Sequence, residues 1–128
     1  MTLLIWTLII AALLPYLAKG PVAYAMNKLG GYDNNHPRAQ QAKLTGFGAR
    51  ALAAHQNAFE SLILFAAAIL LAISTNNIGS TIQYLAIIYI VARIAYNILY
   101  LVNLGTLRSL SWLVSLSCSI AIMFLSLP

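Results

Sequence analysis

A polar helix start that runs directly into a long apolar segment sets the fold of this chain: Arg50-Ala-Leu-Ala-Ala-His55-Gln-Asn57-Ala-Phe-Glu60 is followed by Ser61-Leu-Ile-Leu-Phe-Ala-Ala-Ala-Ile-Leu-Leu-Ala-Ile73. A membrane-spanning helix needs about 20 mainly apolar residues, and this stretch supplies them. Glu60 is one of only two acidic residues in the chain. An unpaired charge within lipid costs roughly 2.5–3.5 kcal/mol on insertion scales. Glu60 must therefore face a polar partner, which makes it a candidate functional residue.

The composition is that of an integral membrane protein. Hydrophobic residues make up 62% of the 128 residues and charged residues 7%, whereas soluble domains have about 45–50% and 25%. Four spans of roughly 20 residues account for nearly the whole chain. We expect spans at about 3–24, 47–74, 78–101 and 110–127, which form one all-α four-helix membrane domain over residues 1–128. The apolar N-terminus has no basic residue ahead of it, so we interpret it as an uncleaved first span.

The distribution of basic residues predicts the orientation. Seven Lys and Arg residues against two acidic residues give a net charge of +5, but they alternate with apolar spans, which argues against a nucleic-acid-binding surface. The connections at 27–48 and 103–109 carry basic residues, whereas 75–81 carries no charge. The positive-inside rule therefore places the two basic connections in the cytoplasm and both termini outside.

Neither a metal site nor an internal disulfide is expected. Cys118 is the single cysteine and lies in an apolar stretch, where a cysteine most often serves as a small packing residue. The spacing of Cys118, His36 and His55 does not match a zinc site.

Polar stripes mark the second and third expected spans. Arg50 and Asn57 are seven residues apart and Glu60 is three further on, so the three share one helix face. His55 points away from this stripe and is expected to contact another helix or a backbone carbonyl. Arg93 needs an anion, and the candidates are Glu60 and a ligand carboxylate. The stripe on the third span recurs at spacings of three and four: Tyr89, Arg93, Tyr96, Asn97 and Tyr100.

Arg108 and Ser109 stand in the short connection before the fourth span. A helix N-terminus favours anions, and a guanidinium strengthens that preference. Together with Arg50 and Arg93, these residues predict a site near the cytoplasmic interface for a small ligand with several carboxylates. Structural roles remain open: arginines that reach lipid headgroups or set topology, tyrosines of an interfacial belt, and a Glu60–Arg93 ion pair that fixes helix register.

These motifs resemble the MAPEG family, the membrane-associated proteins in eicosanoid and glutathione metabolism. Arg50-x-x-x-x-His55-x-Asn57-x-x-Glu60 is similar to the family's helix-two motif, and Arg93-x-x-Tyr96-x-x-x-Tyr100 is similar to its helix-three motif. Leu107-Arg108-Ser109 resembles the start of its fourth helix, and Asn34-Asn-His-Pro-Arg38 resembles a segment of its bacterial members. Gln56 stands where the eicosanoid-synthesising members of the family carry an arginine, and Ala53 stands where some of them carry another.

The resemblance implies a homotrimer in the bacterial inner membrane that binds glutathione as a co-substrate between subunits, near the cytoplasmic face. Arg108 would be the catalytic residue, because a nearby cation lowers the pKa of a thiol from about 8.5 and favours its thiolate. The implied activity is a glutathione-dependent transferase or peroxidase that acts on lipophilic electrophiles or lipid hydroperoxides. The residues implied to bind glutathione are Arg50, Asn57, Glu60, Arg93, Tyr96 and Tyr100.

Two other functions remain open at this point. A non-catalytic trimer could bind membrane lipid or a partner protein, and a small proton-coupled exporter could use Glu60. Gln56 and Ala53 leave two fewer guanidiniums for carboxylates, which also leaves room for a different thiol.

Overall fold

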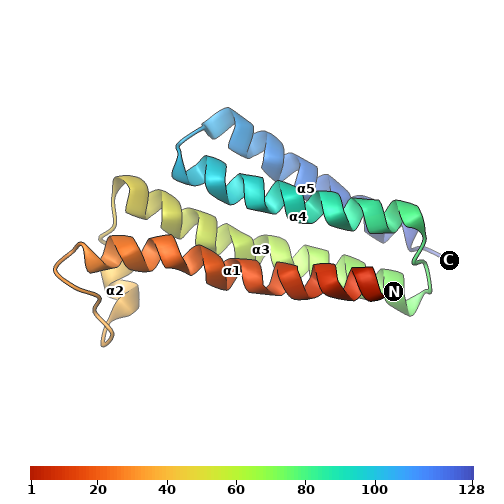
Figure 1. The fold of residues 1–128 in the computed structure, drawn as a ribbon, viewed down its shortest axis with the longest axis horizontal. Helices are drawn as coiled ribbons and strands as arrows, with labels where there is room; N and C mark the ends of the chain where they lie inside the picture. Colours follow the sequence, from red (N-terminus) through yellow and green to blue (C-terminus); the bar gives the residue numbers. More distant parts are fainter.

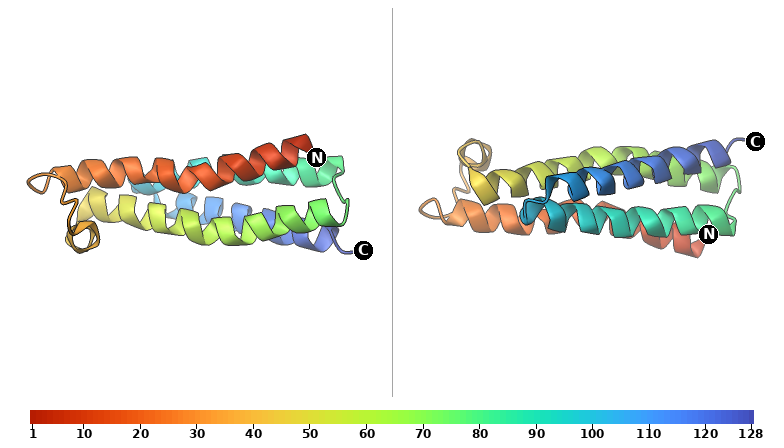
Figure 2. Two further views of the ribbon diagram at one scale, coloured as in Figure 1. Left: turned by 90° about the horizontal axis from the view of Figure 1, so that it is seen from below. Right: turned by 90° about the horizontal axis from the view of Figure 1, so that it is seen from above.

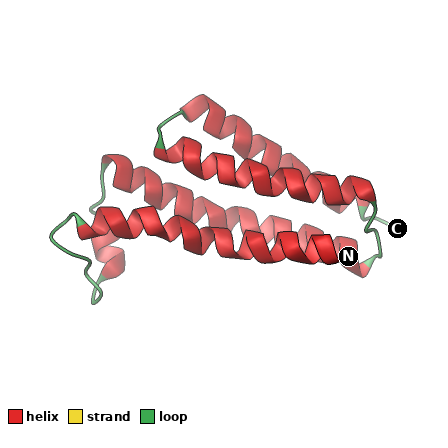
Figure 3. Ribbon diagram, in the orientation of Figure 1, coloured by secondary structure: helices red, strands yellow, loops and turns green.

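A computed structural model describes residues 1–128 as an all-helical protein with four long helices (Figure 1). Each long helix is apolar and long enough to cross a membrane, and no strand is present (Figure 3). The expected all-α architecture with four spans is thus confirmed, and the protein is an integral membrane protein. The elements are α1 (Thr2–Asn27), α2 (Pro37–Gln41), α3 (Gly46–Ser74), α4 (Ser80–Leu101) and α5 (Gly105–Leu125).

The start of the fourth span differs from the expectation. Helix α5 begins at Gly105 rather than near 110, so the last connection covers only residues 102–104. Gly105 and Thr106 lower the local hydropathy without preventing a helix, which is why the apolar run alone placed the boundary too late. Arg108 consequently lies in the first turn of α5 and not in a connection.

The long helices form two antiparallel pairs, α1 with α3 and α4 with α5 (Figures 1 and 2). Helix α3 contacts both α4 and α5, and α1 also contacts α4. The main core cluster joins the pairs through residues such as Phe65 of α3, Tyr89 of α4 and Ile122 of α5. The pairs diverge towards the end of the bundle that carries α2 (Figure 1).

Both termini lie at one end of the bundle with the uncharged connection, and the two basic connections lie at the other end (Figure 1). This is the arrangement that four antiparallel spans predict. Which end faces the cytoplasm stays a prediction.

The long basic connection is held against the end of α1 by Gln40, a buried residue of α2. Its Nε2 donates to the carbonyl oxygens of Met26 at 3.1 Å and Gly31 at 2.7 Å, and its Oε1 accepts from the Asp33 N–H at 2.9 Å. Asp33 Oδ1 in turn accepts the backbone N–H groups of Asn35 and His36, each at 3.0 Å. These bonds satisfy backbone groups of the exposed turn and fix it to the buried side chain of Gln40.

Candidate functional site

Arg93 is buried in α4 and is the cationic centre of the polar residues between the helices. Its side chain is 2% exposed, and Nη2 donates to Asn57 Oδ1 on α3 at 2.8 Å. The guanidinium carbon lies 4.2 Å from the centroid of the Tyr96 ring, within the range of a cation–π contact. Nη1 has no hydrogen-bond partner. A buried cation therefore keeps one donor free.

The ion pair between Glu60 and Arg93, one of the alternatives that the sequence leaves open, is absent. The only salt bridge in the chain joins His36 to Asp33 at 3.9 Å, and Glu60 is exposed. Asn57 lies three residues earlier on α3, which is about 4.5 Å along the axis and about 60° around it. This offset makes Asn57 the acceptor for Arg93, while Glu60 lies with residues of α5.

Glu60 lines a pocket of about 210 Å³ between α3 and α5. Two serines of α5 also line it and donate their hydroxyl protons to their own helix: Ser115 Oγ to the Trp112 carbonyl at 2.8 Å, and Ser119 Oγ to the Ser115 carbonyl at 3.3 Å. Their oxygen atoms stay available as acceptors. Together with the Glu60 carboxylate, they make this pocket suitable for a hydrogen-bond donor such as an ammonium group.

Arg108 lines a second pocket, of about 220 Å³, with Asn57, Tyr96, Tyr100, Ser109 and Trp112. Its guanidinium carbon lies 4.4 Å from the centroid of the Tyr100 ring, and the Tyr96 and Tyr100 rings meet edge to face at 5.6 Å. No side chain caps the N-terminus of α5, so its first N–H groups lack a side-chain partner. A cation beside a helix N-terminus favours an anion.

The two pockets adjoin, because Asn57 and Trp112 line both. We call them together the polar groove. It lies between α3, α4 and α5, with hydrogen-bond acceptors on the Glu60 side and a cation on the Arg108 side. Such a groove fits a small ligand that carries both an ammonium group and carboxylates. No cluster of histidine, cysteine, aspartate or glutamate in the chain could hold a metal ion.

Comparison with known sequences gives a match over residues 3–128 to the MAPEG family. The chain belongs to the MAPEG family. No curated protein and no solved structure matches it. Membership of the MAPEG family indicates a membrane protein of the glutathione-related transferase and peroxidase type, and the motifs quoted above lie within the matched residues.

Arg50 of this MAPEG chain lies apart from the other predicted site residues. Its Nη2 donates to the Leu101 carbonyl at 3.4 Å, its Nε is buried without a partner, and it lines neither pocket of the polar groove. His55 also points elsewhere, as expected, because its Nδ1 lies 2.7 Å from the Pro15 carbonyl oxygen on α1.

The tyrosine stripe of α4 divides between two sides of the helix. Tyr96 and Tyr100 line the polar groove, whereas Asn97 faces a cavity beside α1. Tyr89 is buried, with its hydroxyl 2.8 Å from Ser61 Oγ and its ring stacked on Phe65 at 3.7 Å. Tyr89 therefore supports the core next to the groove.

Sequence reasoning missed the wall that α5 contributes. Trp112, Ser115 and Ser119 line the polar groove, yet none was predicted as a site residue. Their spacing of three and four, in a helix that is otherwise mainly apolar, was the available signal.

Proposed function

We propose that this protein is the subunit of a homotrimeric, glutathione-dependent membrane enzyme that acts on lipophilic electrophiles or lipid hydroperoxides. The observation that carries the proposal is the polar groove, in which an unpaired carboxylate and an arginine stand at opposite ends. Glutathione has two carboxylates, one ammonium group and one thiol, which complements that arrangement. Each pocket alone is below the roughly 300–1,000 Å³ of a typical ligand site, so a tripeptide would need both.

The binding roles follow from the groups that are left free. The Glu60 carboxylate, which has no salt bridge, would accept the ligand's ammonium group. Arg93 lines neither pocket of the polar groove, so its free Nη1 would reach a ligand carboxylate only after a movement of its side chain or of Asn57. The resulting charge-assisted hydrogen bond would be a strong one. Asn57 would fix the Arg93 guanidinium, while Tyr96 and Tyr100 would offer hydroxyl groups. In this proposal, Arg50 would help to bind glutathione only in the groove of a neighbouring subunit.

Arg108 would act on the thiol. Its guanidinium and the open N–H groups at the start of α5 would favour a thiolate over a thiol, because they stabilise the negative charge. In the transferase reaction, the thiolate attacks an electrophilic carbon, a C–S bond forms and the leaving group departs with the electron pair. With a hydroperoxide, the thiolate attacks the terminal oxygen of the O–O bond, and the alkoxide leaves and takes a proton. This attack forms an S–O bond and leaves the sulfenic acid of glutathione, which reacts with a second glutathione to give the disulfide and water.

Calorimetry with the purified, detergent-solubilised protein tests the binding step. We expect glutathione to bind to the wild-type protein at millimolar or lower concentration and to bind at least tenfold more weakly to Arg108→Ala, since charged hydrogen bonds contribute about 1.5–3 kcal/mol. Arg38→Ala is the matched control, because Arg38 is an exposed arginine of α2 at the same end of the bundle. Equal binding by all three proteins would overturn the role of Arg108.

An absence of binding by an intact trimer would support the non-catalytic alternative. Gln56 and Ala53 would then be the reason, because they remove two guanidiniums that the resemblance assigns to the eicosanoid-synthesising members.

A further inference from the structure

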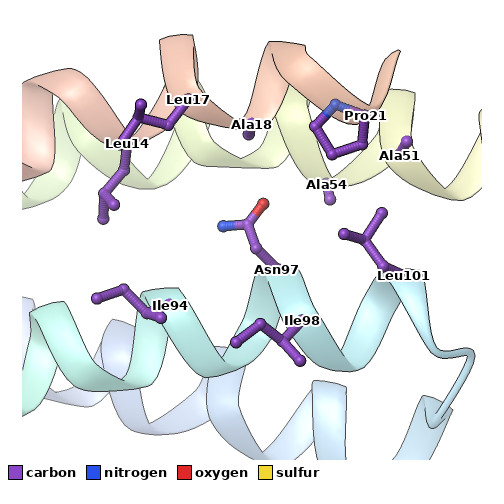
Figure 4. Close-up of a pocket in the computed structure, with 10 residues that line it drawn as sticks. All are labelled: Leu14, Leu17, Ala18, Pro21, Ala51, Ala54, Ile94, Asn97, Ile98 and Leu101. Carbon is purple, nitrogen blue, oxygen red and sulfur yellow. The ribbon is translucent and has the colours of Figure 1, made fainter. Parts of the chain in front are cut away.

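A separate cavity lies on the α1 side of the contact between α3 and α4, whereas the polar groove lies on the α5 side (Figure 4). Its volume is about 200 Å³, and residues of α1, α3 and α4 line it. The wall from α3 consists of Ala51 and Ala54, which are 1% and 2% exposed. Because these side chains are small, they leave the space that larger residues would fill.

The cavity opens on the outer surface of the subunit. Leu17 of α1 and Ile98 of α4 line it, and both are also largely exposed on the outer surface, at 71% and 55%. An apolar cavity of about 150 Å³ in a soluble protein stays dry and binds benzene. A larger cavity that opens within the membrane span therefore suits a hydrocarbon guest better than water.

Asn97 is the only residue with a polar side chain among those that line the cavity. Its amide points from α4 into the space between α1 and α3 (Figure 4). Nδ2 donates to the Arg93 carbonyl at 3.0 Å, and Oδ1 accepts no hydrogen bond from the protein. Asn97 is half-buried, so Oδ1 is accessible to a donor that a guest in the cavity supplies.

A second acceptor borders the same cavity. Pro21 has no backbone N–H, so α1 cannot make the usual hydrogen bond to the Leu17 carbonyl four residues earlier. Leu17 and Pro21 both line the cavity. The lining is thus apolar except for Asn97, whose Oδ1 has no donor from the protein, and the Leu17 carbonyl near the cavity lacks the donor that a residue other than Pro21 would give it. A guest with one O–H group would complement Asn97.

We propose that this cavity binds the alkyl chain of a lipophilic alcohol from the membrane, with the hydroxyl group of the guest donating to Asn97 Oδ1. The alcohol is either a free long-chain alcohol or a lipid that carries a hydroxyl group near its chain. The site is independent of glutathione, because it lies on the other side of α3 and α4 from the polar groove.

Photolabelling of the full chain in nanodiscs tests the proposal. The probe is a long-chain alcohol with a diazirine in its chain. The comparison probe is the corresponding diazirine alkane, which lacks the hydroxyl group. We expect the alcohol to label residues 14–21 and 94–101, and an unlabelled alcohol of the same length to compete. Asn97→Leu should weaken the apparent affinity for the alcohol about three- to tenfold, the range of one hydrogen bond, and leave labelling by the alkane unchanged.

Two further variants separate the cavity from the amide. Ala54→Leu should block labelling by both probes, because the larger side chain occupies the cavity; Ala18→Leu fills it from the α1 wall if the first variant does not fold. Gln83→Leu is the matched control, since Gln83 lies on α4 outside the cavity and its Nε2 donates to the Ile78 carbonyl. Glutathione binding should be unchanged in Asn97→Leu, which keeps this test separate from that of the polar groove.

Two results would overturn the proposal. Even labelling of the whole lipid-facing surface, unchanged by Ala54→Leu or Ala18→Leu, would show that the cavity holds no guest. Equal affinities for the alcohol in the wild type and Asn97→Leu would show that the amide does not recognise the hydroxyl group.

Discussion

Arg93 and Asn57 connect α4 to α3 through a hydrogen bond of 2.8 Å between Nη2 and Oδ1. The guanidinium is 2% exposed, so Asn57 supplies an acceptor that neither lipid nor water replaces. We expect Asn57→Leu to lower the free energy of unfolding by about 2–3 kcal/mol, because a buried charged donor is left without its partner. Denaturant titration in mixed micelles measures this loss.

The double variant Asn57→Leu, Arg93→Met provides the control for that experiment. It removes the charge together with its acceptor, and replacing both partners by apolar groups is often nearly neutral. Most of the lost stability should therefore return. If the double variant is as unstable as Asn57→Leu, packing and not the hydrogen bond explains the effect.

Arg108 gives a prediction for the pH dependence of turnover, which rests on the proposed function. Without the guanidinium, the pKa of bound glutathione should return towards about 8.5, and a shift of one unit corresponds to about 1.4 kcal/mol. The rate at saturating glutathione should then fall about tenfold at pH 6.5 in Arg108→Ala and approach that of the wild type above pH 9, where the thiol ionises in both. Conjugation of 1-chloro-2,4-dinitrobenzene measures these rates. A deficit that is the same at every pH would contradict thiolate stabilisation by Arg108.

Substitution by alanine is expected to change the stability of the protein differently at two glycines of the long helices. A Cβ at Gly48 would lie 2.9 Å from Leu44 Cδ2 and 3.0 Å from Ala25 Cβ, whereas one at Gly20 would meet no atom within 4 Å. Gly48→Ala should therefore destabilise the protein by about 1–3 kcal/mol through overpacking. Gly20→Ala should be neutral or should stabilise by up to about 1 kcal/mol, because alanine has the higher helix propensity. Thermal unfolding of both variants in one detergent makes the comparison, and a Gly48→Ala protein as stable as the wild type would exclude a tight contact there.

The sequence predicted helices better than it predicted how they meet. Apolar run lengths located four spans, because a span must match the thickness of the hydrocarbon core. Periodicity also placed Asn57 and Glu60 correctly on one helix face. Which of them meets Arg93 depends on the axial offset between α3 and α4, and the pattern of a single helix does not contain that offset.

The same limit explains the other differences at the site. Asn97 shares the tyrosine spacing of α4 but lies at the edge of that stripe, so it faces α1 and not the polar groove. Ser115 and Ser119 look like ordinary small residues of a membrane helix, which often serve close packing. Only the position of α5 beside Glu60 gives these two serines a place in the site.

The orientation in the membrane predicts opposite labelling of the two ends of the bundle. Ser80 is exposed beside the uncharged connection, and Ala39 is exposed in α2, within the basic connection. In a Cys118→Ser background, each position can carry the only cysteine of the chain. The positive-inside rule predicts that a membrane-impermeant maleimide added to intact cells labels Ser80→Cys, and that Ala39→Cys reacts only after the cells are permeabilised. The reverse pattern would put the polar groove's Arg108 end outside the cell, away from the millimolar cytosolic glutathione that the proposed reaction requires.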